Sequence, residues 1–247
     1  MEMVCVTAEA FGYGPIITCV NVIKALAKKI NVPFAFLGSG VALEQAKMSG
    51  LFSDYIECET HLEDEVRKQP IFQKAKWIIS FENPCGAICG VQENKHVFYV
   101  DNLFWMWDRI PRELHDVDVY FASETMELDK NIERIGRPIK NFQKVGPLRK
   151  FKQVTSLEMN NRILINLGGA ESFLEDYSTI LRMYVVILRN FFASLNGVFD
   201  GEIVVCGGNR ITSALGEVFR EREVQFRSFG NAEYLEMMKK SKYLVMS

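Results

Sequence analysis

Short apolar segments alternate with helix-like segments along almost the whole chain. The apolar segments are rich in β-branched and aromatic residues, and we expect them to be strands at 3–7, 32–37, 54–58, 77–81, 97–100, 117–122, 162–166, 202–206, 224–227 and 243–246. Helices are expected between them, at about 15–29, 41–48, 61–68, within 172–195, and at 212–221 and 232–240. Repeated strand–helix–strand units build parallel sheets, so the pattern predicts an α/β fold. Because most of the strands are apolar throughout, we expect both faces of the sheet to be covered.

A polar segment interrupts this pattern and indicates two domains. Residues 149–161 lack apolar periodicity, and the strand–helix pattern starts again at 162. We therefore expect an N-terminal Rossmann-like domain at 1–148, a linker at 149–161 and a C-terminal Rossmann-like domain at 162–247. No helix follows the apolar strand at 243–246 to cover it. This predicts a partial second domain with exposed apolar surface, through which the chain could self-associate.

Composition excludes several classes of protein. Hydrophobic residues make up 48% of the chain and charged residues 24%, which is typical of a packed globular protein and excludes disorder. The net charge of -2 provides no basic excess for binding nucleic acid, so small molecules are the expected ligands. The longest apolar stretch, 179–193, contains Arg182 and Arg189, and it is too short to span a bilayer. We expect a core helix there and no integral membrane segment.

The cysteines indicate a cytoplasmic protein. They are spread along the chain, several inside apolar segments, as expected for reduced and buried thiols: Cys5, Cys19, Cys58, Cys85, Cys89 and Cys206. The N-terminus has no signal-peptide pattern. Cys85 and Cys89 have no second pair at zinc-binding spacing, and the three histidines are far apart in sequence. We therefore predict no metal site.

Two nucleotide-binding motifs are absent or incomplete. Gly12 and Gly14 could begin a GxGxxG dinucleotide fingerprint, but its third glycine is replaced by Ile17 and Pro15 occupies the loop. This disfavours nicotinamide chemistry. No GxxxxGK[ST] motif occurs, which disfavours a nucleoside triphosphatase of the P-loop type.

Acidic residues follow several strands of the first domain. Glu9, Glu82 and Asp101 each end or follow a predicted strand, and carboxyl ends of parallel strands share one edge of a sheet. A carboxylate there can act as the general base of a transfer reaction, and Asp101 is the first choice with Glu9 and Glu82 in reserve. The alternative is that each one caps the following helix. The segment 103–107 adds aromatic residues, including Trp105, which either stack on a substrate ring or belong to the core.

Two glycine loops follow strands of the second domain. Each precedes a predicted helix, whose N-terminus attracts anions, so a phosphate group is the expected ligand. The residues are Gly168, Gly169, Gly207, Gly208 and Asn209. The alternative is that these glycines only make tight turns.

The segments 11–15, 163–169 and 204–208 together resemble the GT-B group of nucleotide-sugar-dependent glycosyltransferases and their relatives. The segment 99–107 is also loosely similar to that of cytosylglucuronate synthases. The resemblance implies two facing Rossmann-like domains, the second incomplete because a further loop and helix would follow 243–246. It implies no obligatory metal and no cofactor besides the nucleotide-sugar, which is the donor substrate. The donor would bind the glycine loops of the second domain, and the small-molecule acceptor would bind the first domain at Gly12, Tyr13, Gly14 and Trp105.

Three functions stay open at this point. The first is an enzyme that transfers a sugar from a nucleotide-sugar to a small acceptor, provided that the domain is complete. The second is a nucleotide-sugar hydrolase or epimerase on the same scaffold. The third is a non-catalytic binding module.

Overall fold

A computed structural model describes residues 3–124, 128–146, 159–168 and 176–246. The chain divides into two compact units, one made of Met1–Ala10 with Gly14–Phe151 and the other of Phe11–Tyr13 with Lys152–Ser247. The predicted linker, 149–161, lies mostly outside the described residues, so the predicted domain boundaries stay a prediction.

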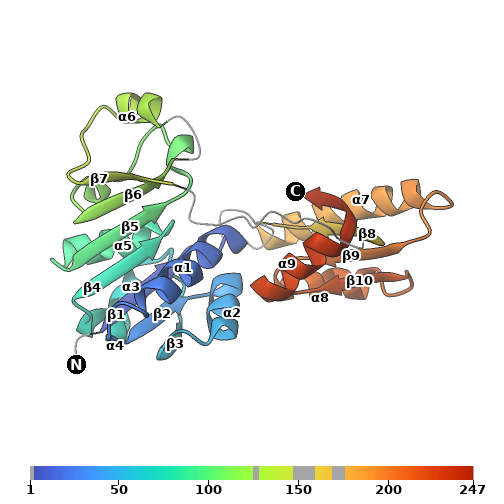
Figure 1. Cartoon of the computed structure of the whole chain (residues 1–247), viewed down its shortest axis with the longest axis horizontal. Helices are drawn as coiled ribbons and strands as arrows, with labels where there is room; N and C mark the ends of the chain where they lie inside the picture. Colours follow the sequence, from blue (N-terminus) through green and yellow to red (C-terminus); the bar gives the residue numbers. More distant parts are fainter. Residues whose placement is uncertain (1–2, 125–127, 147–158, 169–175, 247) are drawn as a thin grey trace. The chain divides into compact units, whose positions relative to one another are not determined.

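The first unit contains a parallel sheet that has seven strands in the described part of the chain. Their order across the sheet is β3-β2-β1-β4-β5-β6-β7, and every neighbouring pair is parallel (Figure 1). The strands are β1 Val4–Ala8, β2 Phe34–Gly38, β3 Asp54–Glu57, β4 Trp77–Phe81, β5 His96–Asp101, β6 Val119–Ser123 and β7 Phe142–Val145.

The helices of the first unit connect these strands. They are α1 Tyr13–Leu26, α2 Gly40–Ser49, α3 Glu63–Lys68, α4 Pro70–Lys74, α5 Pro84–Gln92, α6 Asp129–Ile135 and the 3-10 helices η1 Phe104–Met106 and η2 Arg112–His115. Sequence reasoning missed α4, α5, α6, β7 and both 3-10 helices. Most of these elements are short, and α5 contains Gly86 and Gly90, which are weak helix formers. The hydrogen bond from the Gly86 N–H to the Asn83 side chain, at 2.9 Å, caps the start of α5.

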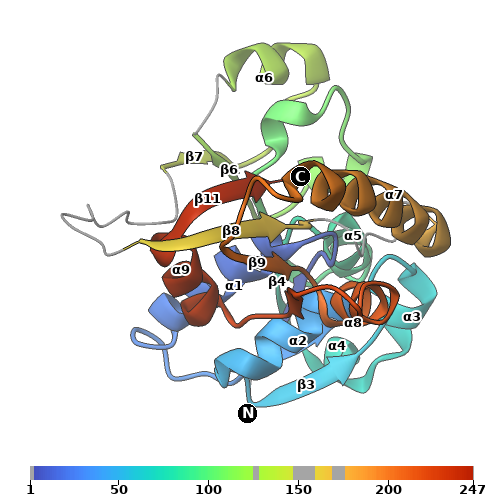
Figure 2. The same ribbon diagram turned by 90° about the vertical axis from the view of Figure 1, so that its right-hand side faces the viewer.

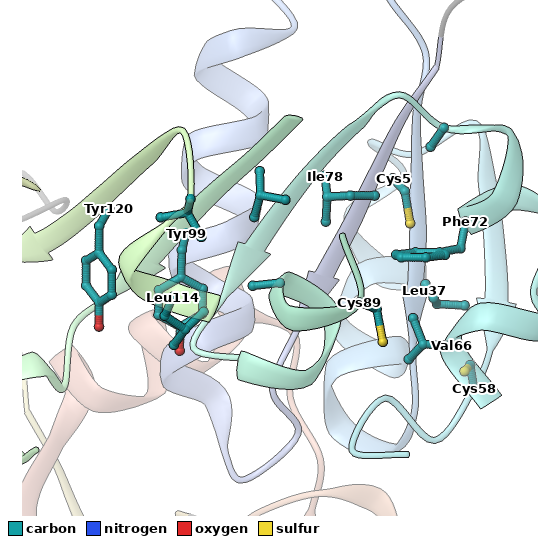
Figure 3. Packing of buried hydrophobic residues seen from close by; sticks show 14 of the residues in the cluster. Cys5, Leu37, Cys58, Val66, Phe72, Ile78, Cys89, Tyr99, Leu114 and Tyr120 are labelled. Atoms are coloured by element: carbon teal, nitrogen blue, oxygen red, sulfur yellow. The ribbon is translucent and has the colours of Figure 1, made fainter. Parts of the chain in front are cut away.

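One face of this sheet carries the main core. Figure 3 shows Cys5, Ile78, Tyr99 and Tyr120 of the strands gathered with side chains such as Phe72, Cys89 and Leu114 from the helices and 3-10 segments of that face. All six cysteines lie in described residues and are free thiols, five of them buried and Cys85 partly buried. Burial raises the pKa of the Cys5 thiol to about 12, so it stays protonated. The expectation of reduced, mostly buried thiols is confirmed.

The opposite face of the same sheet is only partly covered. A cavity of about 610 Å³ lies between it and α1, with apolar lining residues throughout: Val4, Val22, Leu26, Ile30, Val32, Phe34, Trp77, Ile79, Phe98, Val100, Phe121 and Val145. The expectation of two fully covered faces is therefore wrong for this face. Within the described residues, α1 is the helix that lines this cavity, and the residues of β4 to β7 that line it are apolar.

The second unit is a smaller parallel sheet, which has four strands in the part that the structure describes. The order is β10-β9-β8-β11, for β8 Asn160–Asn166, β9 Glu202–Cys206, β10 Val224–Arg227 and β11 Ser241–Met246. Figure 2 shows β11 beside β8 at the edge of this sheet. The helices are α7 Tyr177–Leu195, α8 Asn209–Val218 and α9 Asn231–Lys240.

Helix α7 packs on this second sheet. Ile180, Tyr184, Leu188 and Phe192 recur every four residues along one side and are buried in the unit's core. Its 19 residues make it the one helix within the described ranges that is long and apolar enough to cross a membrane. Its buried stripe packs in the core of this unit, as predicted, whereas the expectation that the stretch is too short to span a bilayer is wrong, because the helix has 19 residues.

Strand β11 leaves apolar side chains exposed. Tyr243, Leu244 and Val245 are 47%, 47% and 38% exposed on this edge strand. The exposed apolar surface predicted for the strand is thus observed. Self-association through it stays a prediction.

We expect Gly86→Ala to destabilise the first unit by about 1 to 3 kcal/mol, because a Cβ at this position would lie 2.6 Å from the Asn83 Oδ1 atom and 2.7 Å from the Thr7 Oγ1 atom. The protein's three tryptophans, Trp77, Trp105 and Trp107, all belong to this unit, so urea unfolding followed by tryptophan fluorescence measures it. Gly14→Ala is the matched control, since nothing lies within 4 Å of a Cβ there. Equal unfolding midpoints for both variants would contradict the crowding at Gly86.

Candidate functional site

The first sheet has a topological switch point between β1 and β4. From β1 the chain proceeds toward β2 and β3, whereas from β4 it proceeds in the opposite direction toward β7. The helices that follow these two strands therefore leave toward opposite faces, which opens a crevice beyond the strand ends, where α/β proteins commonly bind ligands. Glu9 follows β1 and Glu82 follows β4, so these two carboxylates flank the switch point.

Glu9 is held in place by hydrogen bonds to both of its oxygens. It is only 4% exposed; the Ala10 N–H donates to Oε1 at 2.8 Å, and the Asn83 Nδ2 donates to Oε2 at 2.9 Å. The same Asn83 amide also reaches the Thr60 hydroxyl, at 3.2 Å. Burial raises the pKa of Glu9, and these two hydrogen bonds partly offset the rise. Glu9 is therefore part of a buried network that joins the strand ends.

Glu82 combines backbone strain with a shifted pKa. Its φ of 52° lies in the left-handed region, which is uncommon for a residue other than glycine and often marks functional sites. The side chain is buried, and its Oε1 accepts a hydrogen bond from the Asn102 Nδ2 at 2.6 Å. The pKa of Glu82 is raised to about 7, mainly by burial and also by the nearby Asp101 and Glu9 carboxylates, against the hydrogen bonds from Asn102, which lower it. Glu82 can therefore both accept and release a proton near neutral pH.

Asn102 connects Glu82 to the first helix. Its Nδ2 also donates to the Thr18 Oγ1 at 3.0 Å, and Thr18 lies on α1. The amide thus fixes the orientation of the Glu82 carboxylate relative to α1. Sequence reasoning assigned no role to Asn102, and it missed Thr18 because a threonine within a helix carries no pattern.

Asp101, the first choice of sequence reasoning, lies at the end of β5 and is 1% exposed. Its carboxylate accepts three hydrogen bonds, from the Leu103 N–H at 2.8 Å, the Trp107 Nε1 at 3.0 Å and the Tyr120 hydroxyl at 2.6 Å. Burial raises its pKa, and these donors partly offset the rise. Because its oxygens are engaged by protein groups, Asp101 is better suited to holding the following loop than to receiving a proton from a substrate. Its predicted role as base stays a prediction, and the geometry favours Glu82.

The aromatic segment after Asp101 divides between core and surface. Phe104 is fully buried, while Trp105, Met106 and Trp107 are 36%, 53% and 39% exposed. Phe104 therefore belongs to the core, whereas Trp105 is accessible, and its stacking on a substrate ring stays a prediction.

The predicted acceptor loop lies at the start of α1. Tyr13 and Gly14 are the first residues of that helix, and Gly12 lies in the bend between β1 and α1. Gly14 has open space around it. Acceptor binding by these three residues stays a prediction.

The glycines of the second unit differ in their surroundings. A Cβ on Gly207 would lie 3.1 Å from Ile211, so close packing of α8 already accounts for this glycine. Gly208 is the N-cap residue of α8, and Asn209, the first helical residue, is exposed. Among the described residues, a Cβ on Gly168 would lie 3.9 Å from the Asn166 Nδ2 atom. Gly169 lies outside the described residues. Donor binding at these positions stays a prediction.

The described residues contain no group of three or more His, Cys, Asp or Glu side chains that could hold a metal ion. Glu9, Glu82 and Asp101 are held by amide, hydroxyl and indole donors instead.

Comparison with known proteins supports the fold. No protein-family model and no curated protein sequence matches the chain. Among solved structures, a protein assigned as a UDP-N-acetylglucosamine 2-epimerase from Listeria monocytogenes superposes with a TM-score of 0.54 at 10% identity, over 99% of this chain and 74% of that one.

Two further structures are more distant. MurG from Acinetobacter baumannii superposes with a TM-score of 0.43 at 9% identity, over 100% of this chain and 71% of that one. The lipopolysaccharide outer core galactosyltransferase WaaB superposes with a TM-score of 0.40 at 12% identity, over 99% of this chain and 73% of that one.

The Glu82 carboxyl makes the stability of the first unit depend on pH. Its folded pKa of about 7 lies above the value of 4.5 that it has when unperturbed, so its contribution is fully present below about pH 4.5 and is lost as pH rises through about 7. The loss amounts to about 3 kcal/mol. Urea unfolding of wild type and Glu82→Gln, followed by tryptophan fluorescence at pH 5 and pH 8, measures it. We expect the variant to lose less stability than wild type over this interval, and parallel losses would contradict the shifted pKa.

With these two parallel sheets and the superposition on the Listeria protein, the chain has the fold predicted from the sequence, two Rossmann-like domains of the GT-B type.

Proposed function

We propose that this protein is a nucleotide-sugar-dependent glycosyltransferase that passes a sugar to a small-molecule acceptor. The fold supports the use of a nucleotide-sugar, because the Listeria structure that superposes on it bears the name of an enzyme acting on UDP-N-acetylglucosamine. The specific reaction is supported by the site in the first unit.

The observation that carries the proposal is Glu82. A buried carboxyl with a pKa of about 7 at the switch point can take the proton of an acceptor hydroxyl as that oxygen attacks the sugar, while the nucleoside diphosphate leaves. Asn102 holds the carboxylate through one oxygen, at 2.6 Å. The strained φ of 52° at Glu82 is an expected feature of a residue placed for chemistry.

The donor would bind the second unit. Gly168 follows β8, and the N-terminus of α8 follows Gly208 with no side-chain cap from that residue. Backbone N–H groups and helix ends can neutralise a diphosphate without a metal ion. We propose a cytoplasmic location, supported by the six free thiols.

A nucleotide-sugar epimerase or hydrolase is the second candidate. The name of the Listeria structure favours the epimerase. In both cases the same carboxyl at Glu82 would serve as an acid or base, with water or the sugar itself in place of the acceptor.

Turnover of UDP-N-acetylglucosamine by the full chain, with and without a panel of sugar and nucleoside acceptors, distinguishes these reactions. We expect UDP release that depends on an acceptor. UDP release without any acceptor would indicate a hydrolase, and a changed sugar observed by NMR would indicate an epimerase.

We expect Glu82→Gln to lower this turnover by about 10² to 10⁴ because the proton acceptor is removed while the shape is kept. Glu133→Gln is the control, since Glu133 is an exposed glutamate on α6. Asp101→Asn in the same assay compares the two carboxylates. Unchanged turnover in Glu82→Gln would exclude Glu82 as the base.

A further inference from the structure

The cavity between α1 and the first sheet is lined by apolar and aromatic side chains. Its volume of about 610 Å³ lies within the range of small-molecule pockets, about 300 to 1,000 Å³. A sugar, a nucleotide or an ion placed there would lose its hydrogen bonds to water and would meet no charged side chain in the described lining. The occupant that this lining suits is therefore a hydrocarbon.

The cavity reaches the end of the sheet that lies opposite the candidate site. Val4, Phe34 and Trp77 line it, and they are the first residues of β1, β2 and β4. Glu9 and Glu82 follow the other, carboxyl ends of β1 and β4. Val4 and Glu9 are separated by five residue steps along the chain, which correspond to about 16 Å of parallel strand. The cavity is thus a feature separate from the crevice at the switch point.

The cavity is long and crosses the strands. Its lining residues come from six neighbouring strands, from β2 through β1, β4, β5 and β6 to β7. Adjacent strands lie about 4.8 Å apart, so the five intervals span about 24 Å. The hydrocarbon core of a bilayer, two acyl chains deep, is about 30 Å thick, which gives about 15 Å for one chain. One extended acyl chain of membrane length therefore fits along the cavity.

The volume argues against a helix as the occupant. A helix about 10 Å wide that covered the same 24 Å would take up about 1,900 Å³. This is about three times the volume of the cavity, 610 Å³. The dimensions therefore favour a single extended hydrocarbon chain over a helix of another protein or of a second copy of this chain.

Positive charges lie where α1 ends beside the cavity. Lys24, Lys28 and Lys29 are exposed, and residues 10–43 contain no Asp or Glu. Lys24 lies in the last turn of α1, where a cation complements the helix dipole, but Lys28 and Lys29 lie beyond that helix. Lys29 directly precedes Ile30, which lines the cavity and is 43% exposed. An anionic group at this end of a bound chain would meet a cation.

We propose that this cavity binds a long-chain fatty acid, with the hydrocarbon chain along the sheet and the carboxylate beside Lys29. The carboxylate is ionised at neutral pH, and its chain covers apolar side chains that otherwise face water. Binding at this cavity does not rest on the proposed function, because Glu82 and the nucleotide-sugar take no part in it.

Fluorescence quenching locates the bound chain. Trp77 lines the cavity, whereas Trp105 and Trp107, the other tryptophans of the protein, do not. We expect a fatty acid brominated in the middle of its chain to quench the full-length protein saturably, below the concentration at which it forms micelles. Trp77→Phe should lose most of this quenching while it still binds the fatty acid in calorimetry.

The length of the chain tests the hydrocarbon part of the site. Each buried methylene contributes about fourfold to affinity, so dodecanoate should bind about 10²-fold more weakly than hexadecanoate. Val22→Trp should weaken hexadecanoate binding tenfold or more, because Val22 lines the cavity from α1 and the indole would fill part of it. Val198→Trp is the matched control, since Val198 is 80% exposed and belongs to the second unit.

Charge reversal tests the head group. We expect Lys29→Glu to weaken hexadecanoate binding about threefold to tenfold, as for the loss of an exposed ion pair. Hexadecanol, which carries no charge, should bind wild type and Lys29→Glu equally. Lys47→Glu is the matched control, because Lys47 is an exposed lysine on α2 outside the cavity lining.

The proposal is overturned if hexadecanoate does not bind saturably, if dodecanoate binds as tightly, or if Val22→Trp binds like wild type. If Val22→Trp does not fold, the comparison of chain lengths still decides. Dimerisation without uptake of hexadecanoate would assign the apolar face to a second copy, and binding to phosphatidylcholine vesicles alone would assign it to a membrane. Each of these results leaves the proposed transferase untouched, since its test is turnover.

Discussion

The site depends on a buried chain of hydrogen bonds that joins β1 to β4 at the switch point. The Thr7 hydroxyl donates to the Ser80 hydroxyl at 2.8 Å, and the Ser80 hydroxyl donates to the Asn83 carbonyl at 2.6 Å. The Asn83 side chain then donates to Glu9 at 2.9 Å. Thr7, Ser80 and Asn83 are fully buried, so each unmade bond would carry a desolvation cost. This chain sets where β1 and β4 end, and hence where Glu9 and Glu82 lie.

Burying three carboxyl groups at one sheet edge costs desolvation free energy. The groups that offset this cost differ among the three residues. Glu9 and Asp101 receive hydrogen bonds to both of their oxygens. Glu82 is held by Asn102 through Oε1 and has its pKa raised to about 7, because burial and the two neighbouring carboxylates disfavour its charge. The same features that make Glu82 costly make it suitable for proton transfer. This difference between equivalent-looking residues is the physical basis of the proposed mechanism.

Buried polar groups also hold the loop after β5. Asp101 and Asn131 use buried polar groups to hold a backbone whose exposed side chains are apolar. Hydrogen bonds therefore determine the shape of this loop, on which the side chains of Trp105 and Trp107 are accessible. Glu82 and the loop after β5 are linked through two consecutive residues, Asp101 and Asn102.

The sequence alone was sufficient to predict the two parallel sheets and most strand positions. The length of an apolar segment and its alternation with helical segments can be recognised from residues that are neighbours in the sequence. The strands at 77–81, 202–206 and 224–227 were predicted with the bounds that the structure shows. The sequence also predicted that Glu9, Glu82 and Asp101 lie at one edge of the sheet, because the carboxyl ends of parallel strands share that edge. Helix α5 and strand β7 were missed, because two glycines weaken the helical pattern of α5 and half of the residues of β7 are polar.

Only the tertiary structure distinguished the three carboxylates. Their pKa values and the hydrogen bonds that their oxygens accept depend on groups distant in sequence, such as Tyr120 for Asp101 and Asn83 for Glu9. Asn131 could not be found from the sequence either, since its contacts to the loop after β5 cross more than twenty residues. Local pattern determines which segments become strands and where they end, whereas the chemistry of a buried group is decided by the neighbours that folding brings to it.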